Sequence, residues 1–292
     1  MDIAPFIAQH QLPDNYADVA QNWFNPLAEE IAMLQNSAGM PVFVGVNGSQ
    51  GSGKSTLCDY IAFYLQNTQS LNVVVLSVDD FYLSREERFK LSEKVHPLLT
   101  TRGVPGTHDT QLAQSTLWAL KNNQKVALPR FDKASDDPIP ESDWPVINKP
   151  VDIVLIEGWC WGVPAQTEDA LVEPVNTLER REDPQGIWRR FVNTQLAGTY
   201  QQLFEQMDYW VMLKAPSFEH VYQWRCEQEH KLAARQKPGV PSNIMSDEQI
   251  ARFIQHYQRL TEHALSTLPG QCDKVFELDG ERKITNVLKG NR

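Results

Sequence analysis

Short runs of hydrophobic residues without regular polar interruptions recur along the chain. Such runs are typical of strands in a parallel sheet covered on both faces, because neither face of the strand meets water. We predict five buried strands, at residues 42–46, 73–76, 151–156, 209–213 and 275–278.

Between these runs, hydrophobic residues recur every three or four positions, as on one face of an amphipathic helix. Three such series lie at residues 57–65, 188–196 and 250–265. Ser246, followed by Gln249 three residues later, predicts a capping box at the start of the third helix. Because strands alternate with helices, the pattern predicts an α/β, doubly wound fold with a mostly parallel sheet.

The first 40 residues differ from the rest in lacking a predicted strand. Asn25 followed by Pro26 predicts an N-cap and a first-turn proline, and hydrophobic residues follow on one helical face. We therefore expect residues 1–40 to form an N-terminal helical extension on a main domain of residues 41–292. The stretch 134–150 is rich in proline and acidic residues, and we expect a loop there that borders a site.

Composition narrows the range of partners. The formal net charge is −10, with 27 Lys and Arg against 37 Asp and Glu, which argues against a broad nucleic-acid-binding surface. No apolar run is long enough to span a membrane, and the first residues do not resemble a secretory signal. Four widely spaced cysteines suit reduced thiols in the cytoplasm. The sequence leaves the oligomeric state open.

The first predicted strand leads into a glycine-rich motif that fits G-x-x-x-x-G-K-[ST] at every fixed position. It reads Gly48-Ser49-Gln50-Gly51-Ser52-Gly53-Lys54-Ser55-Thr56, and a predicted helix follows. Backbone N–H groups of such a loop surround phosphate oxygens, and the helix N-terminus adds positive potential. We expect Lys54 to reach the β- and γ-phosphates of a nucleotide and Ser55 to contact Mg²⁺. The expected fold is therefore that of the P-loop NTPases.

Acidic residues stand where two other predicted strands end. Asp79 and Asp80 follow the second strand, and Glu157 ends the third. In parallel sheets ligands bind outside the carboxyl ends of the strands. Asp79 could accept the proton of an attacking hydroxyl or help to hold Mg²⁺, and Glu157 could contact the metal through water. Alternatively, the aspartates cap a loop and Glu157 is simply solvated.

A basic segment follows the fourth predicted strand. Its predicted helix carries Arg225 and Arg235 and leads into a Lys-Pro-Gly hinge at residues 237–239. We expect a lid at about residues 216–245, whose arginines stabilise charge on the transferring phosphoryl group. The alternative is an exposed helix laced with salt bridges.

The chain resembles the P-loop kinase family of uridine kinase, phosphoribulokinase and bacterial pantothenate kinase. It is most similar to plant-type D-glycerate 3-kinases and their uncharacterised bacterial and fungal relatives. The resemblance rests on the phosphate-binding loop and on six further segments at residues 77–82, 102–109, 131–133, 157–159, 222–225 and 245–248.

The resemblance implies an ATP- and Mg²⁺-dependent kinase with Asp79 as the catalytic base. It implies an acceptor pocket formed by Asp80, Tyr82, Arg102, His108, Asp109, Phe131, Asp132 and Lys133. Two of these residues have a simpler interpretation. Asp109 could N-cap the helix that follows it, and His108 could be a satisfied loop histidine.

One departure bears on the acceptor. Where plant-type glycerate kinases carry a G-x-G-D-R stretch after the Asp-Lys pair, this chain has residues 134–141, with acids and prolines in place of the arginine and glycines. The sequence thus predicts transfer of the γ-phosphoryl group to a hydroxyl of a small metabolite, with D-glycerate as a candidate. A nucleoside, a pantothenate-like compound or a sugar are alternative acceptors.

Two rival functions use the same loop. A guanine-nucleotide switch would need N-K-x-D after a strand, but residues 148–152 place the aspartate one position late and precede a strand. Residues 183–186 match D-x-x-G only literally. An ATP-binding regulatory or assembly protein is the second rival, and Asp79 favours catalysis over it.

Overall fold

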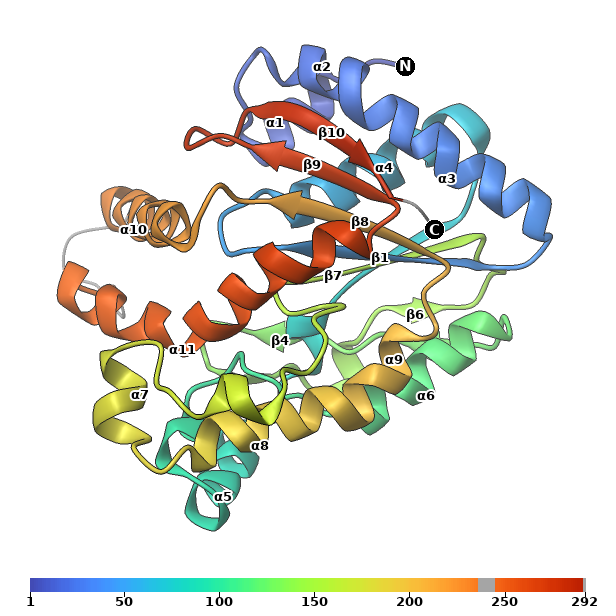
Figure 1. Ribbon diagram of the computed structural model, residues 1–292. Coiled ribbons are helices and arrows are strands. Elements are labelled where there is room, and N and C mark those ends of the chain that lie inside the picture. The colour runs from blue at the N-terminus through green and yellow to red at the C-terminus, as the bar shows by residue number, and fades with distance from the viewer. Residues whose placement is uncertain (236–244, 291–292) are drawn as a thin grey trace.

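The computed structural model describes residues 1–235 and 245–290 and has a six-stranded sheet at its centre (Figure 1). The sheet order is β10-β9-β8-β1-β7-β2. The strands are β1 (Val42–Gly48), β2 (Val73–Ser77), β7 (Ile153–Gly158), β8 (Tyr209–Lys214), β9 (Lys274–Leu278) and β10 (Ile284–Lys289). The first five of these in chain order are the five predicted strands, and they pair in parallel. The predicted α/β fold with a mostly parallel sheet is confirmed.

The sixth strand, β10, was not predicted. It pairs antiparallel with β9 at the sheet edge, and its residues are half-buried or exposed. An edge strand that is covered weakly lacks the continuous hydrophobic run that marked the other five. Residues 134–150 also differ from the expected plain loop. They contain β5 (Asp137–Pro138), which pairs with β4 (Phe131–Asp132), and β6 (Val146–Ile147), which pairs with β3 (Val126–Ala127).

Helices pack on both faces of the sheet. The α-helices of the described residues are α1 (Ala4–His10), α2 (Tyr16–Val19), α3 (Asn25–Ala38), α4 (Lys54–Gln69), α5 (Arg85–Lys94), α6 (Thr110–Lys121), α7 (Thr177–Glu182), α8 (Ile187–Gln195), α9 (Gln201–Phe204), α10 (Phe218–Arg235) and α11 (Asp247–Thr267). Helices α3 and α4 contact β1 on one face. On the other face Phe204 of α9 packs edge-on against Trp210 of β8, with ring centroids 6.0 Å apart.

Both predicted helix starts agree with the structure in position, and Pro26 lies in the first turn of α3 as predicted, but only one start has the predicted cap. Ser246 and Gln249 form the predicted capping box at the start of α11. Asn25, by contrast, does not cap α3, because a preceding turn of π-helix at Ala20–Phe24 continues into it. The Asn25 side chain instead accepts a 2.6 Å hydrogen bond from the Tyr60 hydroxyl of α4.

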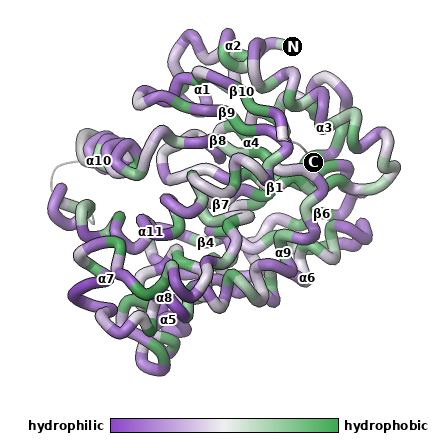
Figure 2. The backbone as a smooth tube through the Cα atoms, in the orientation of Figure 1, coloured by the Kyte–Doolittle hydropathy of each residue, from purple (hydrophilic) through white to green (hydrophobic). Residues whose placement is uncertain are grey.

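The carboxyl ends of the parallel strands converge beside α10, at the left of Figure 1. Figure 2 shows α10 as mostly hydrophilic, whereas the strands that it adjoins are buried. Residues 236–244 of the expected lid lie outside the described residues. No helix in the described part of the chain is long and apolar enough to cross a membrane.

Candidate active site

The phosphate-binding loop joins the end of β1 to the start of α4. Gly51 and Gly53 have φ angles of 78° and 91°, in the left-handed region that favours glycine. A Cβ atom on Gly51 would also lie 2.9 Å from the Cβ of Trp224, so α10 packs closely against the loop. Because α4 begins at Lys54, its first backbone N–H groups are directed at the loop, where an anion would bind.

Several polar atoms of this loop are buried without a hydrogen-bond partner. They are Ser49 Oγ, Gln50 Oε1 and Ser52 Oγ. A buried polar atom that lacks a partner costs about 1–3 kcal/mol, so proteins keep few of them outside ligand sites. This unmet hydrogen-bonding capacity fits a loop that binds a polar ligand, and the serine hydroxyls can donate to phosphate oxygens.

Ser55 and Glu157 meet at the point where α4 begins and β7 ends. The Ser55 hydroxyl donates a 2.7 Å hydrogen bond to Glu157 Oε1, and Lys54 Nζ lies 3.7 Å from Glu157 Oε2. Glu157 is 5% exposed, and its Oε2 has no hydrogen-bond partner. A hydroxyl beside a carboxylate with an unused acceptor atom fits the oxygen ligands that Mg²⁺ takes from proteins.

Asp79 lies in a 3₁₀ turn, Val78–Phe81, directly after β2. Its Oδ1 accepts a 2.7 Å hydrogen bond from the Tyr82 hydroxyl, and its Oδ2 accepts a 2.6 Å bond from Lys133 Nζ. Burial raises the pKa of Asp79, but Lys133 and Tyr82 outweigh this effect and lower the pKa to about 2. The carboxylate is therefore ionised at neutral pH and held in one orientation.

Asp80 is used differently from its neighbour. Its Oδ2 accepts hydrogen bonds from the Ser77 backbone N–H, at 3.0 Å, and from Arg130 Nη1, at 3.2 Å. Ser77 and Asp80 form a capping box around the turn. For Asp80, this is the loop-capping role that the sequence offered as the alternative to a part in the chemistry. Asp80 thus fixes the turn that presents Asp79.

These groups surround one cavity of about 380 Å³. It is lined by Ser55, Asp59, Val75, Ser77, Asp79, Asp80, Arg130, Phe131, Lys133 and Glu157. Six of these were predicted site residues, drawn from four separate segments of the chain. Arg130 and Asp59 were not predicted, although Arg130 directly precedes the predicted Phe131.

His108 and Tyr82 form a stacked pair beside Asp79. Their rings stack with centroids 4.6 Å apart, and both side chains are buried. His108 Nδ1 is hydrogen-bonded to the Tyr200 hydroxyl, and burial lowers the pKa of His108 to about 4, so the ring is neutral at pH 7. His108 therefore supports Tyr82, and through it Asp79, rather than offering a positive charge.

The remaining predicted pocket residues pair with other residues of the chain. Arg102 pairs with Asp136 and lies 5.5 Å from the Phe131 ring centroid. Asp132 accepts a 2.9 Å hydrogen bond from the Ala134 N–H within its own turn. Asp109 accepts a 2.9 Å hydrogen bond from the Leu112 N–H and N-caps α6, as its simpler interpretation stated.

Arg225 of the expected lid is paired within α10. Its Nη2 lies 2.5 Å from Glu229 Oε2, and its guanidinium lies 5.6 Å from the Phe253 ring centroid. The pair is largely buried, unlike the exposed salt-bridged helix that was the alternative, and the expected lid role of Arg225 stays a prediction. Arg235 ends α10, and its side chain lies outside the described part of the structure.

Arg282 contacts the phosphate-binding loop, and the sequence did not predict this contact. It lies between β9 and β10, and its Nε donates a 2.8 Å hydrogen bond to the carbonyl of Gly51. Its guanidinium also lies 5.0 Å from the Trp224 ring centroid. Arg282 therefore braces the phosphate-binding loop against α10. Nothing in the sequence indicates this role, because 231 positions separate Arg282 from Gly51.

The segments that resemble guanine-nucleotide motifs have structural roles. Asp183 is 1% exposed and accepts hydrogen bonds from the N–H groups of Trp188 and Arg189 at the start of α8. Asp152 accepts a 2.7 Å hydrogen bond from the Asn72 N–H just before β7. Neither carboxylate lines the cavities beside the phosphate-binding loop.

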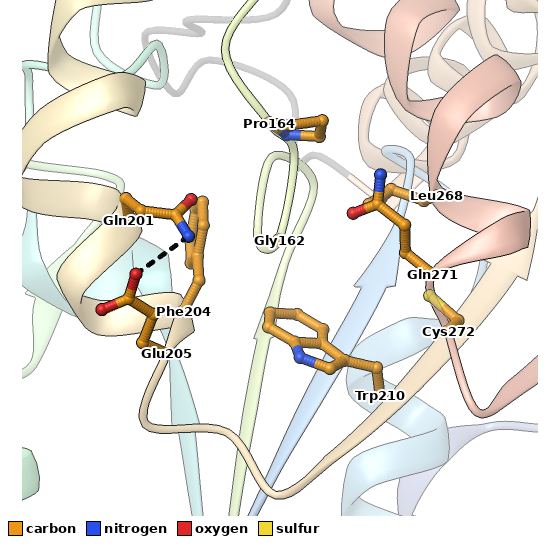
Figure 3. Close-up of a pocket in the computed structure, with 9 residues that line it drawn as sticks. All are labelled: Gly162, Pro164, Gln201, Phe204, Glu205, Trp210, Leu268, Gln271 and Cys272. Atoms are coloured by element: carbon orange, nitrogen blue, oxygen red, sulfur yellow. Dashed lines mark hydrogen bonds between the residues drawn. The ribbon is translucent and has the colours of Figure 1, made fainter. Parts of the chain in front are cut away.

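A separate pocket of about 110 Å³ contains none of the predicted site residues (Figure 3). It is lined by Gly162, Pro164, Gln201, Phe204, Glu205, Trp210, Leu268, Gln271 and Cys272. In its wall the rings of Phe204 and Trp210 meet edge-on, and Gln201 donates a 3.2 Å hydrogen bond to Glu205. It lacks the glycine-rich loop and strand-end carboxylates that phosphoryl transfer requires.

Comparison with known proteins places this geometry in a family. No family model matches the chain. The chain is 35% identical over 240 residues to an uncharacterised kinase of Schizosaccharomyces pombe, mug58, covering 79% of this chain and 83% of that one. It is 32% identical over 264 residues to the chloroplastic D-glycerate 3-kinase of Arabidopsis thaliana, covering 85% of this chain but only 54% of the plant protein.

A solved structure agrees with these relatives. The D-glycerate 3-kinase of Cryptococcus neoformans superposes with a TM-score of 0.76 at 25% identity, over 92% of this chain and 99% of that one. The structural similarity thus extends over most of the length of both chains. The chain belongs to the family of ATP-dependent P-loop kinases of small molecules that includes D-glycerate 3-kinase, uridine kinase and pantothenate kinase.

Proposed function

We propose that this kinase transfers the γ-phosphoryl group of ATP, with Mg²⁺, to a hydroxyl of a small hydroxy acid, and that D-glycerate is the first candidate. The observation that carries the proposal is the cavity beside the loop, in which the Asp79 carboxylate lies 2.6 Å from Lys133 Nζ. An acceptor with a hydroxyl and a carboxylate can use both groups there. The plant and fungal relatives named as D-glycerate 3-kinases support this choice.

The donor side of the reaction rests on the loop. Backbone N–H groups at residues 48–56 and Lys54 would hold the phosphates, as in other P-loop proteins. Ser55 and Glu157 would hold Mg²⁺, which neutralises charge on the phosphate oxygens when it is bound. Thr56 would complete the first turn of the helix that faces the nucleotide.

The acceptor side rests on Asp79. In the proposed step the acceptor oxygen attacks the γ-phosphorus, the bond to the bridging oxygen breaks, ADP leaves, and the hydroxyl proton passes to Asp79. A carboxylate with a pKa of about 2 is a weak base, so Asp79 acts chiefly by orienting the hydroxyl and accepts the proton as the new bond forms. Tyr82 and Asp80 keep the carboxylate in place.

Four carboxylates, Asp59, Asp79, Asp80 and Glu157, line the cavity, so an acidic acceptor would depend on its few cations. Lys133 and Arg130 line it, and Arg102 lies next to it. Arg102 is held by Asp136, in the segment that departs from the plant-type pattern. An acceptor carboxylate would therefore bind Lys133 and Arg130 first, and would compete with Asp136 for Arg102.

The proposal keeps only part of the expected lid. Arg225 would stabilise phosphoryl charge only after leaving Glu229, and Arg235 remains a proposed partner on the same helix.

The four described cysteines include Cys58 and Cys160, which are buried thiols, and a reducing compartment such as the cytoplasm suits them.

The proposal is tested by an acceptor screen. ADP release would be measured with MgATP and D-glycerate, L-glycerate, simple sugars, nucleosides and pantothenate. We expect D-glycerate or another small hydroxy acid to raise the rate well above background hydrolysis. Selective turnover of a nucleoside, a sugar or pantothenate would show that the acceptor belongs to that class and is not a small hydroxy acid. Background turnover with the whole panel would favour a regulatory ATP-binding protein.

A further inference from the structure

A second cavity meets the phosphate-binding loop from the side opposite the carboxylates. Its volume is about 570 Å³, which is in the range of small-molecule sites, about 300–1,000 Å³. Ser52, Gly53 and Thr56 form the end of the cavity nearest the loop. Part of the opposite wall comes from the N-terminal extension, at residues 11–24.

The extension is attached to the helix that begins at the loop. Tyr60 of α4 has the rings of Phe6, Tyr16 and Phe24 around it, with centroids 5.3, 5.9 and 6.1 Å away. Tyr60 also donates a hydrogen bond to Asn25 at the start of α3. Because aromatic packing fixes the extension to α4, the wall that it forms has a defined position relative to the loop.

The β9–β10 hairpin supplies the other wall. Leu278 and Ile284 line the cavity, and Phe276 of β9 contacts Phe24 of the extension edge-on, with ring centroids 6.0 Å apart. Figure 1 shows α2 above β10 and α1 beside it. Two segments from opposite ends of the chain thus close around one space.

The chemistry of the cavity changes from one part to the next. Leu12, Tyr16 and Val19 give the extension's wall an apolar and aromatic surface, whereas Lys231 and Arg282 add positive charge. A nucleotide bound with its phosphates in the loop has only its nucleoside left to place. The carboxylate-lined cavity on the other side of the loop suits the acceptor, and the apolar one suits a flat heterocyclic base.

We propose that the N-terminal extension, through Leu12, Tyr16 and Val19, forms one wall of the site for the base of the nucleotide. The inference deepens the proposed function, because it takes ATP as the phosphoryl donor. It gives residues 1–40 a part in donor binding, and the packing of the extension on α4, the helix that begins at the loop, brings its wall to the nucleotide.

The test compares two tryptophan substitutions on neighbouring exposed residues. Asn15 lines the cavity and makes no capping hydrogen bond, whereas Asp14 does not line it. Asn15→Trp should fill the base site, and Asp14→Trp is the matched control. Binding of ATP and of inorganic tripolyphosphate to each full-length variant would be measured by calorimetry, without an acceptor.

We expect Asn15→Trp to weaken ATP binding at least about tenfold and to leave tripolyphosphate binding unchanged, with Asp14→Trp close to wild type for both. Leu12→Ala, which removes part of the wall, should also weaken ATP selectively. Equal ATP affinity in all variants, or equal loss for both ligands, would overturn the inference. These binding measurements contain no acceptor, so their outcome does not depend on the result of the acceptor screen.

Discussion

Lys133 Nζ lies 2.6 Å from Asp79 Oδ2, although 54 positions separate the two residues in the chain. Asp79 follows β2, and Lys133 follows β4, which folds back over the carboxyl end of β2. The contact lowers the pKa of Asp79 against the effect of its burial. It also places a cation where the carboxylate of an acidic acceptor would bind. Under the proposed function, this one lysine would both orient Asp79 and bind the acceptor.

We expect Lys133→Ala to move the acidic limb of the kcat profile to higher pH. In the wild type Asp79 is ionised above a pKa of about 2, so it does not limit the rate at mildly acid pH. Without Lys133 the effect of burial predominates, the pKa rises, and a larger fraction of Asp79 is protonated at a given pH. The measurement is kcat as a function of pH at saturating substrates.

Lys133→Arg provides the control for this profile. It keeps the positive charge, so its acidic limb should stay near that of the wild type even if KM for the acceptor changes. An unchanged limb in Lys133→Ala, with only a higher acceptor KM, would show that Lys133 binds the acceptor without tuning Asp79.

Glu157→Gln should weaken Mg²⁺ binding while sparing the metal-free nucleotide. Glu157 accepts a hydrogen bond from Ser55, and its other oxygen is buried with no hydrogen bond and lies 3.7 Å from Lys54 Nζ. Removing its charge should raise the Mg²⁺ concentration needed for half-maximal activity by about 10–100-fold. Affinity for ATP in the presence of a chelator should remain within about twofold. If the variant also lost ATP binding in the presence of the chelator, Glu157 would instead be needed to shape the phosphate-binding loop.

Acid should destabilise the fold partly through His256. This histidine of α11 is 3% exposed, and burial lowers its pKa to about 4, whereas in the unfolded chain the value is near 6.5. The unfolded state therefore binds the proton first, and stability falls as pH drops from about 6.5 towards 4. At pH 5 this term costs about 2 kcal/mol relative to pH 8.

Urea denaturation at pH 8 and pH 5 measures this term. His256→Phe should reduce the difference in unfolding free energy between the two pH values, and the exposed His230→Gln should not. His108 has the same sign of shift, so a residual pH dependence is expected. An undiminished difference in His256→Phe would assign acid sensitivity to other groups.

Local signals in the sequence were enough to predict most of the sheet and the phosphate-binding loop. The five parallel strands are continuous hydrophobic runs, and the loop's glycines and lysine stand at fixed spacing. The capping box of Ser246 and Gln249 is equally local. Strand β10 was not predicted because its residues are half-buried or exposed and form no such run, unlike β2 at the other edge of the sheet. Asn25 was misread because its side chain bonds Tyr60, a contact made only by tertiary packing.

The site shows the same division between local and long-range signals. Asp79 and Glu157 could be predicted because strand ends in a parallel sheet meet at one edge. Arg282 could not, because its contact with the Gly51 carbonyl depends on a hairpin turn near the end of the chain. The pairing of Arg102 with Asp136 also depends on how residues 131–138 fold back. Charge pairing of this kind leaves no periodic pattern to detect.

The central claim is that Asp79 directs phosphoryl transfer to a small hydroxy acid. The most direct measurement follows formation of the phosphorylated acid from D-glycerate and MgATP by ³¹P NMR, in the wild type and in Asp79→Asn, with ATP affinity measured alongside. We predict product in the wild type and a rate at least about 100-fold lower in Asp79→Asn, with ATP affinity unchanged. Equal product formation by both proteins would contradict the account.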